Sequence, residues 1–274
     1  MFGKLLKHEF RATARIIPLA WAAMAVIVGL YLLIEKLNIA WLQGTGFALV
    51  ILSVVAVNFL TLGVAGIRFY QTGYHREGYL THTLPVTTGQ LLWSKVLVAL
   101  IWIFCSTLLV LGGLAAVLAP LIQRTPDLQM LVDLLLAWVK QAGTVPVVLG
   151  GLLFVLFGSL DSVAQIFTAI ALGNLPGNQK HSLGLSVLFY VLINQVLGTL
   201  CGTLAMLLPP ALRFSTTGVE WSMNVPFMSI LALDSGAAEG AFEYGLVGLI
   251  LQFALSFVML FVVKKLMDKK LSVK

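Results

Sequence analysis

Charge is what this sequence has least of. Asp, Glu, Lys and Arg make up only 10% of its 274 residues, whereas a typical soluble domain has about 25%. Hydrophobic residues make up 59%, and the mean hydropathy is +1.00. A soluble fold has no place for so large an apolar excess. The composition therefore excludes a soluble enzyme, a disordered tail and a nucleic-acid-binding domain.

Cysteine and known chemical motifs are also scarce. The two cysteines, Cys105 and Cys201, lie in apolar runs and have neither metal-ligand nor disulfide-framework spacing. None of the four histidines belongs to an HExxH pattern, so we expect no metal site. The chain has no GxxxxGK[ST] phosphate loop, no internal repeat and no linker. We therefore expect one domain over residues 1–274 that neither binds a cofactor nor hydrolyses ATP itself.

Apolar runs dominate what is present. A run of about 20 apolar residues is long enough to cross the bilayer core as a helix. Six runs qualify, and only the fourth contains a charged residue, Asp161. They are Ile17–Ile34, Gly44–Ile67, Val96–Ala119, Val147–Gly173, Leu183–Leu208 and Gly245–Val263. The sequence predicts an all-α membrane protein with six transmembrane helices.

The basic residues predict the orientation. With six crossings both termini lie on one side, and lysine and arginine favour the cytoplasmic side. If the termini are cytoplasmic, all 17 basic residues except Lys36, Arg124, Lys140 and Arg213 are cytoplasmic too. We therefore expect a multi-pass protein of the cell membrane with cytoplasmic termini. The same distribution explains the net charge of +6 by orientation and contact with anionic lipid, without any nucleic acid.

The first fifteen residues are basic and amphipathic. Apolar positions such as Phe2, Leu6 and Phe10 recur at helical spacing, and basic residues occupy the other face. This pattern predicts a helix lying in the cytoplasmic interface. The alternative is a basic flank that only orients the first span. The start of the chain is not predicted to be a signal peptide, because the apolar run Ile17–Ile34 is long enough to span the membrane.

Two connections on the predicted outer side are long. In Asp127–Gln141 an apolar stripe that includes Trp138 predicts a helix on the outer interface, capped by Thr125 and with Pro126 in its first turn. The other connection, Pro209–Tyr244, contains several charges as well as Trp221 and Phe227. Whether part of it re-enters the membrane is left open by the sequence.

The longest cytoplasmic connection is Arg68–Lys95. Pro85 interrupts it, and Tyr74–Thr83 has the pattern of a short amphipathic helix. Thr87 and Gln90 have the spacing of a capping box, which predicts a new helix that starts at Thr87 and continues into the third span. The connection is thus predicted to be a helix, a break and a second helix that faces the cytoplasm.

The text of this connection, YLTHTLPVTTGQLLWSK, resembles the connection between the second and third spans of ABC-2 type permeases, the membrane subunits of ATP-binding-cassette exporters. IFTAIALGNLPGNQKHSLGLSVLFYVL is similar to the family's junction between spans four and five, and the basic start is similar to its connector helix. The resemblance implies a dimer of six-span subunits, either homologous or identical. Each would dock on a separate ATPase subunit that binds ATP and Mg²⁺, and would export a substrate such as a peptide, an antibiotic or a lipid-like amphiphile.

We expect the Arg68–Lys95 connection to be the coupling element, because it is cytoplasmic, stiff and joined directly to two spans. Aromatic and aliphatic side chains would supply apolar contact, and Arg76 and Glu77 would set the register. The candidate residues are Tyr74, His75, Arg76, Glu77, Tyr79, Leu80, Leu84 and Pro85. The alternative is a solvated loop whose tyrosines rest on the lipid interface.

Polar residues inside the spans form a second candidate set. A carboxylate at the depth of Asp161 costs about 2.5–3.5 kcal/mol to insert. Gln165 lies one turn later, and amides in the second and fifth spans are expected at similar depth: Asn58, Asn194 and Gln195. They predict either a substrate path or hinge, or polar contacts that hold helices together.

Span five also carries a stripe of small and polar residues at four-residue steps: Ser186, Tyr190, Asn194, Gly198 and Gly202. Such a stripe permits close helix packing, within one subunit or between two copies. Two other classes of protein remain open: a non-catalytic membrane partner such as an immunity protein, and an intramembrane enzyme. An enzyme would need paired catalytic groups at membrane depth, whereas the spans hold one carboxylate. Co-purification with an ATPase would separate the permease from both.

Overall fold

The computed structural model describes residues 2–37, 39–74, 87–175, 181–215, 218–227 and 242–271. Within these ranges six helices are long and apolar enough to cross a membrane, which confirms the predicted number of spans. They are α2 (Ile17–Leu37), α3 (Ala40–Gly73), α5 (Thr88–Arg124), α7 (Thr144–Gly173), α8 (Ser182–Leu207) and α10 (Leu246–Leu271). The structure agrees with a helical multi-pass membrane protein.

Most of these helices are longer than the apolar runs that predicted them. Helix α3 continues past Ile67 to Gly73, and α5 begins at Thr88, before the apolar run that starts at Val96. Hydropathy marks only the part of a helix that fits the bilayer core, whereas backbone hydrogen bonding continues through polar residues with good helix propensity. The helices therefore project beyond the predicted membrane-spanning section.

The start of α5 confirms the predicted cap. Thr87 has an extended backbone, and its hydroxyl oxygen accepts a hydrogen bond from the Gln90 backbone N–H at 3.3 Å. The bond satisfies one of the unpaired N–H groups of the first turn. The long connection after α3 therefore ends in a defined helix start.

The predicted outer helix is present as α6 (Pro126–Ala142), with Pro126 in its first turn. The predicted cap by Thr125 is wrong. The Thr125 hydroxyl donates to the carbonyl oxygen of Leu121 at 3.1 Å, so it binds the end of α5 and makes no side-chain cap of α6. The side chain of Trp138, a member of the predicted apolar stripe, lies outside the described side chains.

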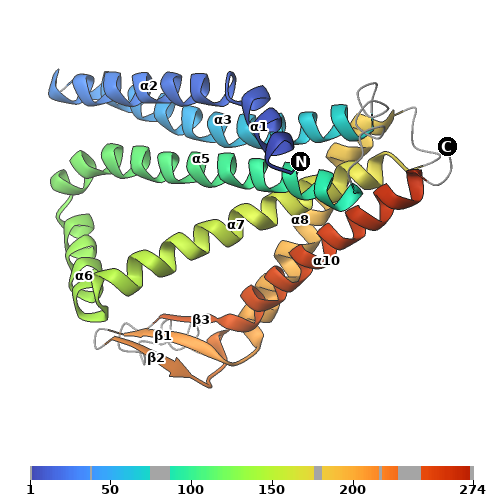
Figure 1. Cartoon of the computed structure of the whole chain (residues 1–274). Helices are drawn as coiled ribbons and strands as arrows, with labels where there is room; N and C mark the ends of the chain where they lie inside the picture. The colour runs from blue at the N-terminus through green and yellow to red at the C-terminus, as the bar shows by residue number, and fades with distance from the viewer. Residues whose placement is uncertain are drawn as a thin grey trace.

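The spanning helices form two groups that meet at one end and separate toward the other (Figure 1). Helices α2, α3 and α5 pack together, and so do α7, α8 and α10. We call the end that holds α1 (Phe2–Thr13) and the last turns of α10 the terminal end. The opposite end, which we call the distal end, holds α6, which runs from α5 to α7 (Figure 1). The two groups thus enclose a wedge that widens toward α6.

The main core lies where the two groups meet. It is built from buried side chains of α3, α5, α7 and α10, and the rings of Phe69 and Phe167 stack at its centre with centroids 4.0 Å apart. A second core cluster joins α2, α3 and α5, and includes Tyr31, Val50 and Val110. The last fifteen residues of α7, by contrast with its first fifteen, are mostly buried. Contact between the groups is therefore concentrated at the terminal end.

The connection between α8 and α10 contains a small antiparallel sheet. Its strands are β1 (Ala211–Ser215), β2 (Gly218–Ser222) and β3 (Phe242–Gly245), in the order β2-β1-β3. The sequence did not predict these strands, because each has only four or five residues and β3 pairs with β1 across 26 intervening residues. The sheet is an addition to the predicted all-α architecture, whose helical bundle the structure confirms.

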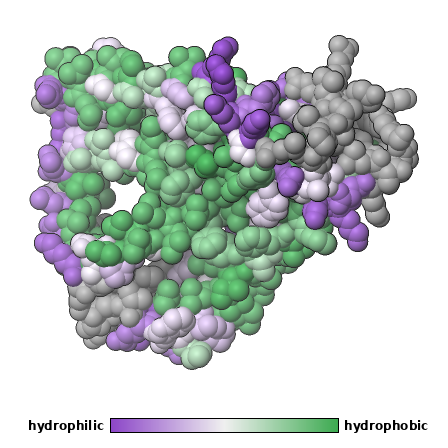
Figure 2. All heavy atoms as spheres, viewed as in Figure 1, coloured by the Kyte–Doolittle hydropathy of each residue, from purple (hydrophilic) through white to green (hydrophobic). Residues whose placement is uncertain are grey.

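Two glycines let α10 leave this sheet in backbone contact with α8. A Cβ on Gly245 would overlap the carbonyl oxygen of Ala205, and one on Gly248 would overlap that of Cys201. Such an approach leaves no room for any larger residue. Elsewhere the surface is mostly hydrophobic over the helices (Figure 2), with exposed aliphatic side chains such as Leu183, Val187 and Val191 on α8. A hydrophobic surface of this kind fits contact with lipid.

Candidate functional site

The predicted coupling segment lies between α3 and α5. Of its candidate residues, His75, Arg76, Glu77, Tyr79, Leu80, Leu84 and Pro85 lie outside the described residues. Tyr74 follows the last turn of α3, and its ring meets that of Phe69 edge-on at 5.9 Å. Burial raises the pKa of the Tyr74 phenol well above its usual value, so the side chain stays neutral at physiological pH. Tyr74, the first residue of the segment, is therefore anchored in the core of the bundle.

An ion network that the sequence reading missed holds both flanks of this segment. The Lys95 ammonium, on α5, donates to Glu9 on α1 and, at 2.6 Å, to the Thr72 hydroxyl on α3. Arg68, one turn before Thr72, lies 3.9 Å from the Glu9 carboxylate. The side chains of Lys95 and Glu9 are only 4% and 12% exposed, so this ion pair is poorly screened by water. Three helices meet at one carboxylate.

The sequence held one signal for this network. Glu9 is the only acidic residue in the basic first helix. The exposed side chains of Lys4, Lys7, His8 and Arg11 agree with the predicted basic face, but Glu9 is buried. The apolar face packs on α5, where Phe10 stacks on Trp102 with ring centroids 4.7 Å apart. Helix α1 is therefore docked on the bundle, and its position relative to a membrane stays a prediction.

Asp161 lies in a buried polar cluster between α7 and α10. Its carboxylate accepts hydrogen bonds from the amide of Gln252 at 2.7 Å, the hydroxyl of Ser256 at 2.6 Å and the amide of Gln165 at 2.8 Å. The Gln165 oxygen in turn accepts from the Asn194 amide of α8 at 3.0 Å. All these partners are neutral donors. The cluster joins three helices by polar contacts at membrane depth.

This cluster contains three of the five predicted polar residues. Asn58 is half-buried on α3, and its amide donates to the Val54 carbonyl of its own helix at 3.2 Å. Gln195 is exposed on α8. Gln252 and Ser256 were missed, although they are four residues apart in an apolar run, the same spacing as Asp161 and Gln165. That spacing was a usable signal, because it places two polar groups on one helix face.

The predicted stripe on α8 divides into two parts. Ser186 is buried against α7, where a Cβ added to Gly173 would overlap its hydroxyl, and Tyr190 is half-buried. Gly198 and Gly202 are exposed, and an added Cβ at either would meet nothing within 4 Å. Close packing within the subunit therefore involves the beginning of the stripe, whereas its two glycines face outward beside Gln195 and Asn194.

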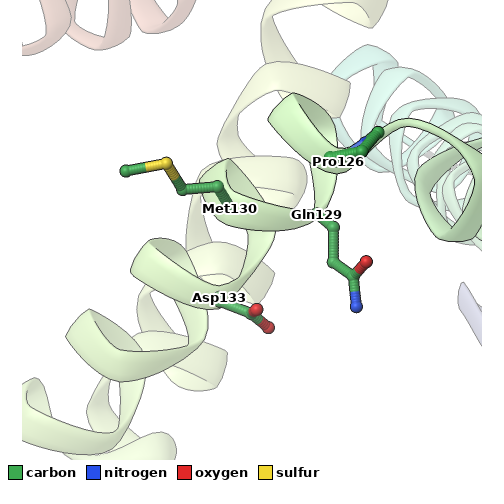
Figure 3. Close-up of a pocket in the computed structure, with 4 residues that line it drawn as sticks. All are labelled: Pro126, Gln129, Met130 and Asp133. Atoms are coloured by element: carbon green, nitrogen blue, oxygen red, sulfur yellow. The ribbon is translucent and has the colours of Figure 1, made fainter.

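Asn58 and Tyr190 line a cavity of about 790 Å³ between α3, α5 and α7. Asp161 is not among its lining residues, because its side chain binds α10. A shallower hollow lies on α6, where Pro126, Gln129, Met130 and Asp133 all come from one helix (Figure 3). Met130 points away from Gln129 and Asp133 there, so these side chains do not converge on a common point.

The three-stranded sheet, which we call the distal sheet because β2 contacts α6, contains a buried glutamate. Glu243 of β3 is 4% exposed and accepts a hydrogen bond from the Ser222 hydroxyl of β2 at 3.0 Å. The Ser222 hydroxyl oxygen also accepts from the Asn224 backbone N–H at 3.1 Å. These bonds fix the end of the sheet. Over the described residues, no group of three or more His, Cys, Asp and Glu side chains has a metal-binding arrangement.

Comparison with known proteins adds no relative. No family model, no curated protein sequence and no solved structure matches the chain.

Proposed function

We propose that this chain is the membrane-spanning permease subunit of an ATP-binding-cassette exporter. It resides in the cell membrane with cytoplasmic termini and pairs with a second permease copy or a homologous permease. Each subunit docks through residues 74–85 on a separate ATPase subunit, which binds and hydrolyses ATP with Mg²⁺. The resemblance of residues 79–95 to ABC-2 type permeases motivates this proposal.

The observation that supports it most is the way the flanks of the docking segment are held. Thr72 precedes this segment and Lys95 follows it. The Lys95 ammonium donates to the Thr72 hydroxyl and also pairs with Glu9 of α1, so it links the two flanks to each other and to α1. The Thr88 hydroxyl also donates to Asp268 near the end of α10. A force applied to residues 74–85 would thus move α1, α3, α5 and α10 together, which is what coupling to an ATPase requires.

The exposed part of α8 supports the dimer. Gln195 faces outward beside Gly198 in the middle of an apolar helix. An amide side chain in contact with lipid tails finds no hydrogen-bond partner, which is energetically unfavourable. A second copy packed on these glycines would bring two backbones close and would supply a polar partner. The outer surface of α8 is therefore the proposed contact between permeases.

Charge reversal within the docking segment tests the proposal. The permease carrying Glu77→Lys and Tyr79→Ala should retain the ATPase subunit poorly after purification in detergent, because a buried unpaired charge costs several kcal/mol in an interface. The matched control is Glu220→Lys, a charge reversal at an exposed position of the distal sheet. Full retention in the double variant, at normal permease abundance, contradicts docking through this segment.

Cysteine labelling tests the orientation. Ser222 is unsuitable as a site because it is buried, but its neighbour Met223 is 79% exposed. In a Cys105→Ser, Cys201→Ser background, a cysteine at position 223 should react with an impermeant reagent in intact cells. One at the exposed His181 should react only after permeabilisation. The reverse pattern rules out the proposed topology.

A further inference from the structure

The 790 Å³ cavity between the two helix groups has the features of a ligand site. We call it the bilayer groove. Its walls come from α3, α5 and α7, with Tyr190 of α8 at one end. Its volume is within the range of about 300–1,000 Å³ that is usual for small-molecule sites. Because three of its walls are spanning helices, a ligand would enter it from the hydrocarbon part of the bilayer.

The groove exists because α5 and α7 separate toward α6 and because two of the α7 residues that line it are glycines. Figure 2 shows an opening between these helices, bordered mostly by hydrophobic residues. Gly151 and Gly158, two turns apart on α7, both line the groove. A Cβ added at either position would meet nothing within 4 Å, so the space beside them is not filled by this chain.

Polarity changes along the groove. Toward the distal end the lining is aliphatic and aromatic, with Leu111, Val148 and Phe154. Toward the terminal end it includes the hydroxyls of Ser162 and Tyr190. Val148 and Ser162 are fourteen positions apart, which corresponds to about 21 Å along a helix. This length exceeds the roughly 15 Å of one leaflet, half the hydrocarbon core of a bilayer, so an extended acyl chain fits along it.

The polar end has free hydrogen-bonding capacity. The Ser162 hydroxyl donates to the Gly158 carbonyl at 2.9 Å, and its oxygen can still accept a bond. Asn58 uses one amide hydrogen on Val54. Within the described part of the chain, neither the Asn58 oxygen nor the Tyr190 hydroxyl has a hydrogen-bond partner. These groups suit a headgroup that carries hydroxyl or amide functions.

Among the residues that the structure describes, none that lines the groove is charged. Asp161, the nearest carboxylate in α7, is turned toward Gln252 and Ser256 and is 5% exposed. An ionic headgroup would therefore lose its hydration without gaining a counter-charge, at a large energetic penalty in this environment. A neutral headgroup would exchange water for the amide and hydroxyls of the groove.

We propose that the bilayer groove binds one hydrocarbon chain of an uncharged amphiphile, with the hydroxyl- or amide-bearing headgroup beside Asn58, Ser162 and Tyr190. If the chain is an exporter subunit, uncharged amphiphiles are its substrate class, and this assignment rests on the proposed function. Binding itself requires only this chain.

Native mass spectrometry of the purified full-length permease tests binding directly. The probes are a monoacylglycerol and an alkyl phosphate of the same chain length. Monoacylglycerol should bind at least about tenfold more tightly, which corresponds to about 1.4 kcal/mol. Equal or tighter binding of the alkyl phosphate overturns the assignment of an uncharged ligand.

Filling the groove supplies the matched variants. Gly151→Leu and Gly158→Leu place a side chain in the empty space and should reduce monoacylglycerol binding at least about tenfold. Gly150→Leu is the control, because Gly150 is also an exposed α7 glycine with open space around it but does not line the groove. Equal folding of the three variants is checked by size-exclusion chromatography and thermal unfolding. Unchanged binding in both groove variants overturns the proposal.

Removing the polar partners tests where the headgroup lies. Tyr190→Phe combined with Asn58→Leu should weaken monoacylglycerol binding several-fold and should not weaken binding of an alkane of equal chain length. An equal loss for both probes places the headgroup elsewhere and overturns this part. If Gly151→Leu converts dimers to monomers while lipid binding is unchanged, a second copy of the chain covers the groove and the proposal is wrong. The ATPase is absent from all these measurements, so their failure is separate from a failure of docking on residues 74–85.

Discussion

The two ends of the bundle are built differently from the same apolar helices. Each end has ion pairing between elements far apart in the chain, and at the terminal end Glu9 pairs with both Lys95 and Arg68. At the terminal end the side chains of Glu9 and Lys95 are 12% and 4% exposed, and Thr72 adds a further hydrogen bond. At the distal end Glu35 pairs with Arg124 at 2.8 Å; the Glu35 side chain is 11% exposed, but the Arg124 side chain is 47% exposed. A buried network joins three helices at one end, and an ion pair with a half-exposed arginine joins two at the other.

This difference indicates a division of labour. The terminal end holds the main core, the capped start of α5 and the buried ion network, so its helices are constrained to move together. At the distal end α5 and α7 have separated, and the bilayer groove lies between them. In a proposed exporter these properties correspond to a part that receives motion and a part that holds a ligand. The following substitutions test the contrast.

The largest effect is expected from Lys95→Met. It leaves the Glu9 carboxylate buried without its closest cation, and breaking such a pair from one side costs about 3–5 kcal/mol. The matched substitution Arg124→Met removes the half-exposed partner of the distal pair and should cost less, about 1 kcal/mol. Thermal and denaturant unfolding in detergent measure both. Similar losses in the two variants would remove the proposed difference between the ends.

A smaller effect is expected from Gly248→Ala. The new Cβ would overlap the Cys201 carbonyl oxygen, so α8 and α10 must move apart, at about 1–3 kcal/mol. Gly29→Ala in α2 is the control, since a Cβ there meets nothing within 4 Å and should be neutral or slightly stabilising. The measurement is unfolding temperature at equal detergent concentration. A stable Gly248→Ala protein would show that the helix crossing is not constrained.

The smallest effect on stability is expected from Asp161→Asn. One asparagine oxygen can accept from Gln165 and Gln252, and its amide can donate to the Ser256 hydroxyl, so the change in unfolding free energy should stay below about 1 kcal/mol. Asp161→Leu, by contrast, leaves these buried donors unpaired and should cost about 1–3 kcal/mol per group. Unchanged transport by Asp161→Asn at normal abundance would support a purely structural role. Lost transport with intact stability would favour a path or hinge.

The contrast between the two ends also shows what a pattern in the chain can predict. The six spans, the start of α5 after Thr87 and the helix after Pro126 depend on residues close in sequence, and all three were predicted correctly. The cap of α6 failed although it is local, because the Thr125 hydroxyl bonds to Leu121 instead. A local pattern shows which hydrogen bonds are available, and it does not show which of two acceptors is used.

Long-range partners were beyond a local pattern. The importance of Asp161 was visible from its charge, but Gln252 and Ser256 come from a helix about ninety residues away. Glu9 and Lys95 are 86 residues apart, and the paired strands β1 and β3 are separated by 26 residues. Nothing in the periodicity of one helix specifies which face of another it meets.

By itself the sequence determined the helical, membrane-spanning character of this protein, because a helix satisfies its own backbone hydrogen bonds and a run of about 20 apolar residues matches the bilayer. Only the tertiary structure decided which polar groups became buried pairs, where α8 and α10 touch at Gly248, and where the bilayer groove opens. The physical reason is that hydrophobicity between helices in a membrane is not directional. Close contacts, steric fit at glycines and a few hydrogen bonds therefore select one arrangement among many that bury the same apolar surface.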